Sequence, residues 1–176
     1  GAHGIAHGVD TVLRAAQILR HRKDIVFLLA GEGAMKKELL ALKESLAIDN
    51  VFMLAAQPMR RMPDFYRASD VCLVPLRDVP LFETFVPSKM FEIMACGVPI
   101  VASVRGESRA ILARSGAARL VAPENVSDLA QAIEWMEAHP REREWMGVAG
   151  RAFVCEHYDR GKMADQYAQV LADIAK

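Results

Sequence analysis

The chain of 176 residues has room for one domain, and its hydrophobic fraction of 52% is enough for a sizeable core. Lys and Arg together number 22, as do Asp and Glu, so no net charge attracts nucleic acid or an anionic membrane. The three cysteines lie far apart, which excludes a disulfide framework and a zinc-ligand spacing and favours a reducing compartment. No apolar run reaches the roughly 18 residues of a membrane span.

Short apolar runs alternate with segments of helical period along most of the chain. Strands are predicted at residues 25–30, 51–54, 71–76, 98–103 and 118–121. Helices are predicted at 9–22, 35–46, 62–69, 107–114, 126–139, 140–157 and 160–176, with one more between 87 and 97. This alternation predicts an α/β fold with a Rossmann-like, doubly wound parallel sheet, followed by extra helices at 126–176. The run 25–30 is apolar throughout, so we expect a strand covered on both faces.

The segment 80–97 combines a loop with the start of a helix directly after a predicted strand. Pro87 or Ser88 suits the first helical position, and backbone N–H groups at a helix start favour a phosphate. Ser88, Lys89 and Glu92 are predicted to share one side, with Phe91, Met94 and Ala95 on the opposite, core-facing side.

A cation and a carboxylate at this place could bind a phosphate and a sugar hydroxyl, which indicates nucleotide binding. The alternative is a surface ion pair between Lys89 and Glu92. The position at the carboxyl end of a strand, where ligands of open α/β sheets bind, favours the binding site.

Two glycine-rich segments are further candidates. Gly31 and Gly33 follow a predicted strand and resemble half of a dinucleotide-binding fingerprint. Lys36 occupies the place of the third glycine, which weakens the case for NAD binding. The alternative to a ligand-binding role is a tight turn between the strand and the next helix. The segment 1–8, with Gly4 and His7, has donors that could reach an anion, the alternative being a plain loop. His3 and His7 are four residues apart, yet no carboxylate or cysteine accompanies them, and we expect no metal site.

Three motifs make the chain resemble the C-terminal, donor-binding half of family 4 (group 1) glycosyltransferases, which have the two-domain GT-B fold. The strand ending in Gly31-Glu-Gly33 is similar to the family's Gly-Asp-Gly. Residues 66–71, Tyr-Arg-Ala-Ser-Asp-Val, resemble Tyr-x-x-Ala-Asp-Val. The most specific likeness is residues 91–101, Phe-Glu-Ile-Met-Ala-Cys-Gly-Val-Pro-Ile-Val. Residues 80–92 most resemble a bacterial branch that builds surface polysaccharides and includes N-acetylfucosamine transferases.

The resemblance implies roles for individual residues. Glu92 would bind the ribose hydroxyls of the nucleotide, and Lys89 would neutralise charge on the diphosphate leaving group. The loop and helix start would hold the diphosphate, namely Phe85, Val86, Pro87, Ser88 and Lys89.

The sequence also departs from the family pattern. The first of the family's two glutamates falls at Thr84, with Glu83 one residue earlier, so Glu83 is a candidate for the role beside the donor sugar. Ala2 and His7 stand where the family commonly has Arg and Lys.

The resemblance predicts a donor-binding domain, residues 1–176, of a retaining glycosyltransferase. The donor would be a nucleoside diphosphate sugar with UDP as the nucleotide, and the acceptor a lipid-linked or saccharide molecule. No further cofactor or nucleic-acid partner is expected. We expect the acceptor-binding domain to lie outside this chain, so that the fragment binds donor without turnover. A cytoplasmic location is expected, with peripheral membrane association through that other domain.

Two other functions stay open at this point. The first is a nucleotide-sugar 2-epimerase, which shares the architecture but acts on the donor without an acceptor. The second is a non-catalytic α/β interaction domain whose last helix, with an apolar stripe from Met163 to Ile174, docks on a partner.

Overall fold

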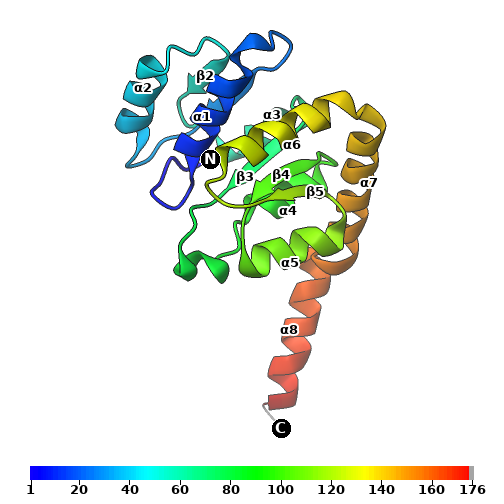
Figure 1. The fold of residues 1–176 in the computed structure, drawn as a ribbon. Helices are drawn as coiled ribbons and strands as arrows, with labels where there is room; N and C mark the ends of the chain where they lie inside the picture. Colours follow the sequence, from blue (N-terminus) through cyan, green and yellow to red (C-terminus); the bar gives the residue numbers. More distant parts are fainter. Residues whose placement is uncertain (175–176) are drawn as a thin grey trace.

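The computed structural model describes residues 1–174 as alternating strands and helices (Figure 1). The strands are β1 Phe27–Ala30, β2 Val51–Leu54, β3 Cys72–Pro75, β4 Ile100–Ser103 and β5 Ala118–Val121. The α-helices are α1 Val9–Ile18, α2 Lys36–Ser45, α3 Met62–Arg67, α4 Lys89–Ala95, α5 Gly106–Ser115, α6 Val126–Ala138, α7 Pro140–His157 and α8 Arg160–Ile174. Short 3₁₀ turns form at η1 Leu19–His21, η2 Met59–Arg61 and η3 Pro80–Glu83. Each predicted element is present, with ends that differ by a few residues.

Every paired strand runs parallel to its neighbour, which confirms the predicted α/β, Rossmann-like fold. The strands form two hydrogen-bonded ladders, β1–β2 and β3–β4–β5. Phe27 pairs with Val51 in the first ladder, and Ile100 pairs with both Cys72 and Ala118 in the second. The prediction of one continuous sheet therefore differs from the structure at a single place, between β1 and β3.

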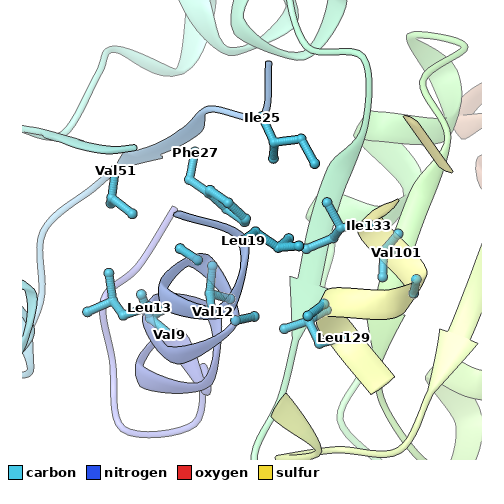
Figure 2. Packing of buried hydrophobic residues seen from close by; sticks show 14 of the residues in the cluster. Val9, Val12, Leu13, Leu19, Ile25, Phe27, Val51, Val101, Leu129 and Ile133 are labelled. Atoms are coloured by element: carbon cyan, nitrogen blue, oxygen red, sulfur yellow. The ribbon is translucent and has the colours of Figure 1, made fainter. Parts of the chain in front are cut away.

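Side chains of the strands alternate between two buried layers. The first layer joins α1, α2 and α6 to one face of the strands, and Figure 2 shows Leu19 of η1 lying between Phe27 and Ile133. The second joins α4, α5 and α7 to the other face of β3 and β4. In β4, Val101 belongs to the first layer and its neighbours Ile100 and Ala102 to the second. Helices thus cover both faces of the three-stranded ladder, as parallel sheets require.

The two-stranded ladder is covered on one face only. Leu28 is 48% exposed and Phe52 is 53% exposed, whereas Phe27 and Val51 are buried against α1. The prediction that the first strand is covered on both faces is therefore wrong. An apolar run cannot by itself distinguish a strand buried on both faces from one whose second face lacks a neighbour.

The C-terminal helices have different surroundings. The helix α6 contributes Leu129, Ile133 and Met136 to the core, so it is an integral part of the domain. The helix α8 extends away from the body of the domain (Figure 1), and its apolar stripe, including Tyr167 and Ile174, is exposed. Within residues 1–174, no helix is long and apolar enough to cross a membrane. The predicted end of the last helix, 175–176, lies outside the described residues.

The loop before α4 lies on the first residue of α5. Gly106 has φ +55°, and a Cβ added there would lie 2.0 Å from the carbonyl oxygen of Glu83. Only glycine accommodates both the left-handed backbone and this contact.

We predict that Gly106→Ala destabilises the domain by at least about 1–3 kcal/mol, since the left-handed conformation alone has that cost for a side chain. The displaced Glu83 backbone adds to it. Gly161→Ala is the matched control, because Gly161 lies in the exposed helix α8 and its added Cβ meets only the end of the Asp159 side chain. Urea denaturation measures both variants, and equal midpoints would contradict the assignment.

Candidate functional site

The first residues of the chain lie across the carboxyl end of β1. Ala2 forms a parallel bridge with Glu32, and the His3 N–H donates to the Glu32 carbonyl over 2.8 Å. The backbone of this segment approaches so closely that a Cβ on Gly31 would lie 1.7 Å from the Gly1 oxygen. A Cβ on Gly33 would lie 2.6 Å from the His3 oxygen. The Gly-x-Gly pattern is therefore required for close backbone approach, whatever its contribution to a ligand.

Arg77 fixes the second half of this N-terminal loop. Its backbone N–H donates to Ala6 O and its Nε to Ile5 O, both over 3.0 Å. Its guanidinium also pairs with Asp10 at 2.9 Å and with Glu124 at 2.8 Å. Sequence reasoning did not find Arg77, because the carbonyls that it binds carry no sequence signal.

The loop brings His7 to the segment that precedes α4. The rings of His7 and Phe85 meet edge to face, with centroids 6.5 Å apart. Phe85 is held in turn by its carbonyl, which accepts a hydrogen bond from Ser108 Oγ over 2.7 Å. Gly4 lies directly beside His7, since a Cβ on Gly4 would be 3.4 Å from the imidazole Nδ1. Two candidate regions far apart in the sequence thus form one surface.

The residues before Phe85 lie on the outer side of this surface. Glu83 and Thr84 are both exposed, and Thr84 Oγ1 donates to the Leu81 carbonyl over 3.4 Å. The Glu83 carboxylate lies close enough to Arg105 to contribute to the raised pKa of that guanidinium, which is due mainly to Asp78. Val86 is half-buried and Pro87 buried.

The helix α4 begins at Lys89, with Ser88 exposed at the preceding position and making no capping hydrogen bond. Its buried side consists of Met90, Ile93 and Met94. Of the predicted core face, Met94 is buried and Phe91 is half-buried against the second layer, whereas Ala95 is exposed, so the prediction is wrong at Ala95 and misses Met90 and Ile93. Lys89, four residues before Ile93, lies on the inward side rather than outward with Ser88.

The Lys89 ammonium is the most unusual charge in the domain. The side chain faces a cavity of about 660 Å³ that Gly1, Ala2 and His3 also line. Within residues 1–174 it has no ion pair and no hydrogen bond, so the alternative of a Lys89–Glu92 surface pair is not realised. Burial lowers the pKa of Lys89 to about 8, because protein atoms replace water around the charge and no carboxylate compensates.

Two histidines of the N-terminal loop each have a ring nitrogen without a partner. The Nδ1 atoms of His3 and His7 are buried and form no hydrogen bond with any of residues 1–174. Burial lowers the pKa of both imidazoles, and the Lys89 charge lowers the pKa of His7 further. A buried ammonium without a partner, next to ring nitrogens without partners, is an arrangement that a bound anion stabilises.

The carboxylate of the site has a neighbour of its own. Tyr66, on α3, donates its hydroxyl to Glu92 Oε2 over 3.2 Å. Burial, followed by the Glu92 charge, raises the pKa of Tyr66, so the phenol stays protonated and remains a donor. In the sequence Tyr66 is only the first residue of a family motif, and the structure adds its contact with Glu92.

The structure therefore brings together the N-terminal loop, Phe85, Lys89 and Glu92, and it leaves Glu83, Thr84 and Ser88 on the exposed side. Their roles stay predictions. No cluster of three metal-binding side chains occurs in the described part of the chain.

Solved structures share this fold. Sucrose-phosphate synthase from Thermosynechococcus elongatus superposes with a TM-score of 0.84 at 24% identity, over 96% of this chain and 42% of that one. Anabaena HepE in complex with UDP-glucose gives 0.81 at 19% identity, over 95% and 45% of the two chains. The C-terminal domain of LpcC, a glycosyl transferase group 1 family protein from Francisella tularensis, gives 0.74 at 20% identity, over 91% and 85%.

Sequence comparison gives a relative and a family. A GDP-mannose-dependent α-(1-6)-phosphatidylinositol monomannoside mannosyltransferase from Mycolicibacterium smegmatis is 25% identical over 169 residues. The alignment covers 94% of this chain, which spans 44% of the length of that relative. The model of the family "Glycosyl transferases group 1" matches residues 3–153, from the N-terminal loop into α7. The chain therefore belongs to the group 1 family of glycosyltransferases.

Proposed function

We propose that this domain binds the nucleoside diphosphate sugar donor of a retaining glycosyltransferase. The observation that carries the proposal is the half-buried Lys89, whose ammonium faces the cavity and has no carboxylate or hydrogen-bond partner among residues 1–174. A diphosphate supplies the negative charge that this arrangement lacks. Family membership, and solved neighbours in complex with UDP or UDP-glucose, support the same chemistry.

The proposal extends to the whole protein. The acceptor is a lipid-linked or saccharide molecule in surface polysaccharide synthesis, as in the N-acetylfucosamine transferase branch, and a further domain binds it. The protein acts in the cytoplasm, at the inner face of the membrane. UDP is the proposed nucleotide of the donor, and GDP is the alternative, because the curated relative is named for GDP-mannose.

Lys89 and His7 both compensate the negative charge of the diphosphate. Lys89 stabilises the charge that develops on the diphosphate as the sugar leaves, where a preorganised cation in a site with little water is most effective. His7 occupies the family's lysine position and becomes a cation when an adjacent phosphate raises its pKa. The resulting imidazolium donates from Nδ1, which has no partner among residues 1–174 in the free domain.

Glu92 orients the nucleotide. Its carboxylate accepts from the Tyr66 hydroxyl, which leaves lone pairs for the ribose hydroxyls. This contact positions the donor and takes no part in bond breaking. Glu83, at the end of the exposed turn η3, is the proposed residue beside the donor sugar. It acts when the bound donor lies against this turn.

We predict that Lys89→Met weakens UDP binding about 10- to 100-fold, the effect of losing a charge-assisted hydrogen bond. Isothermal titration calorimetry with UDP and GDP measures the change. Lys37→Met, on the exposed side of α2, is the matched control and should bind like the unchanged domain. Thermal denaturation should show no loss of stability in Lys89→Met, since an apolar side chain replaces a buried charge. Unchanged affinity for both nucleotides would refute the proposal.

Donor affinity should fall as the pH rises through 8. Lys89 has a pKa of about 8 in the free domain, and the bound diphosphate raises it, so binding favours the protonated lysine. Between pH 7 and pH 9 the protonated fraction of the free domain falls about tenfold, and the affinity for UDP should fall by about the same factor. Lys89→Met should lose this dependence. A decrease that persists in that variant would assign the titration to another group.

Glu92 should determine the preference for ribose over deoxyribose. The unchanged domain is expected to bind UDP about 10- to 100-fold more tightly than 2′-deoxy-UDP, because a carboxylate would lose its hydroxyl partner. Glu92→Gln should reduce this ratio, while Glu38→Gln on the surface of α2 should preserve it. Competition binding with both nucleotides gives the ratio, and an equal ratio in Glu92→Gln would exclude a ribose contact.

A further inference from the structure

The strand β5 is an open edge of the three-stranded ladder. It pairs with β4, and within residues 1–174 no strand pairs with its other side. The Ile100 N–H donates to the Ala117 carbonyl, so Ala117 and, by the alternation of a parallel pair, Arg119 direct their backbone groups toward β4. The N–H and C=O groups of Ala118 and Leu120 therefore point to the open side. Unpaired groups of this kind are the template onto which a further strand adds.

A pocket of about 800 Å³ lies along this open edge. All of β5 lines it, together with Arg109 of α5 and with Asp128 and Gln131 of α6. The two helices cover opposite faces of the strand, since Val121 packs in the buried layer with α6 and Leu120 packs against the layer with α5. A strand added beside β5 would therefore contact a helix on each of its faces.

The lining of this pocket is rich in positive charge. Arg105, Arg109 and Arg119 contribute guanidinium groups, and Asp128 is the carboxylate among the described residues that line it. Arg105 pairs with Asp78 at 2.6 Å. Arg109 and Arg119 form no ion pair with any of residues 1–174. Two guanidinium groups beside an unpaired strand edge are thus available to the carboxylates of a ligand.

Arg119 is held in place before any ligand binds. Its guanidinium carbon lies 4.2 Å from the centroid of the Trp135 ring, on α6. Trp135 stacks in turn on His139, with centroids 4.3 Å apart and an interplanar angle of 14°. A guanidinium stacked on an aromatic ring keeps N–H donors free at its edge. Because its side chain is already ordered, Arg119 loses little conformational freedom when a carboxylate pairs with it.

The arginines also indicate which kind of strand fits the edge. A second copy of this chain, paired through its own β5, would bring two sets of these arginines together, and like charges on neighbouring strands are destabilising. An acidic segment meets opposite charge on both faces, because Arg109 lies on the α5 side and Arg119 on the α6 side. Charge complementarity therefore favours an acidic partner over a second copy.

We propose that the open edge of β5 is a docking site for an extended, acidic segment of a partner protein, which adds to the ladder as a fourth strand. Its backbone pairs with Ala118 and Leu120, and its carboxylates pair with Arg109 and Arg119. Successive side chains of a strand point to opposite faces, so the segment has acidic residues at neighbouring positions. This inference goes beyond the proposed function and does not rest on it.

The test compares three fluorescein-labelled peptides by anisotropy, with the domain free of nucleotide. The first is Ser-Val-Glu-Glu-Val-Glu-Ser. In the second, Gln replaces each Glu, and the third has the first sequence with N-methylated backbone amides, which keeps the charges but prevents strand pairing. The first peptide should bind at least about 10-fold more tightly than either control. Hydrogen exchange followed by NMR should show about 10-fold slower exchange of the Ala118 and Leu120 amides with the first peptide only.

Variants of the domain test the arginines. Arg109→Gln should weaken binding of the first peptide about threefold, and the double variant Arg109→Gln/Arg119→Gln about 10-fold. Arg109 is exposed, and its replacement leaves the stack on Trp135 intact, so the single variant is expected to fold normally. Arg14→Gln, on the exposed side of α1 and away from the pocket, is the matched control and should bind like the unchanged domain.

Each of four outcomes would overturn the proposal. The first is equal affinity for the first two peptides, and the second is equal affinity for the N-methylated peptide without protected amides, which shows charge attraction alone. The third is binding to phosphatidylglycerol vesicles that needs the two arginines and leaves the same amides unprotected, which assigns the arginines to a membrane surface. The fourth is protection of these amides without peptide, together with dimers in sedimentation. None of these results bears on donor binding, which the Lys89 titration tests separately.

Discussion

The site depends on one contact between backbones, in which Gly1–His3 lies directly on Gly31 and Gly33. With no Cβ at either glycine, the N-terminal loop comes close enough to hydrogen-bond to Glu32. This contact, together with the Arg77 clamp farther along the loop, directs His7 toward Phe85 and the start of α4. A side chain at either glycine would push the loop away and break the hydrogen bond between His3 N–H and the Glu32 carbonyl. The surface that joins His7, Phe85 and the start of α4 therefore depends on Gly31 and Gly33, which follow β1 and have no side chain.

The positive charge of Lys89 at this surface lacks the carboxylate partner that buried cations of folded proteins usually have. Buried cations are normally paired, yet Lys89 has no ion pair within residues 1–174 and lies near the imidazole of His7. Burial lowers the pKa of both groups, and the Lys89 charge lowers the pKa of His7 further. Such an arrangement is unfavourable in the free domain and becomes favourable once an anion is present. Natural structures retain unfavourable local arrangements of this kind mainly at functional sites.

The sequence predicted the order and type of the elements because apolar runs and glycine or proline breaks are local signals. Candidates such as Lys89 and Glu92 were found because they follow a strand. Their orientation was not predicted. Seven residues of α4 contain too few turns for periodicity to decide between Met90 and Phe91 as the buried position, and packing against β4 decided it. The contact between His7 and Phe85, and the clamp by Arg77, join segments distant in sequence, for which composition and spacing carry no information.

Lys89 couples the folding of the domain to the binding of its ligand. Its side chain lines the cavity beside β1 and β3, where protein atoms replace water around the ammonium and lower its pKa. A bound diphosphate supplies the missing negative charge and so removes an energetic cost that the folded domain otherwise carries. Because an anion that binds only the folded state stabilises it by mass action, nucleotide should protect the domain against unfolding, and the protection should be smaller once Lys89 is replaced.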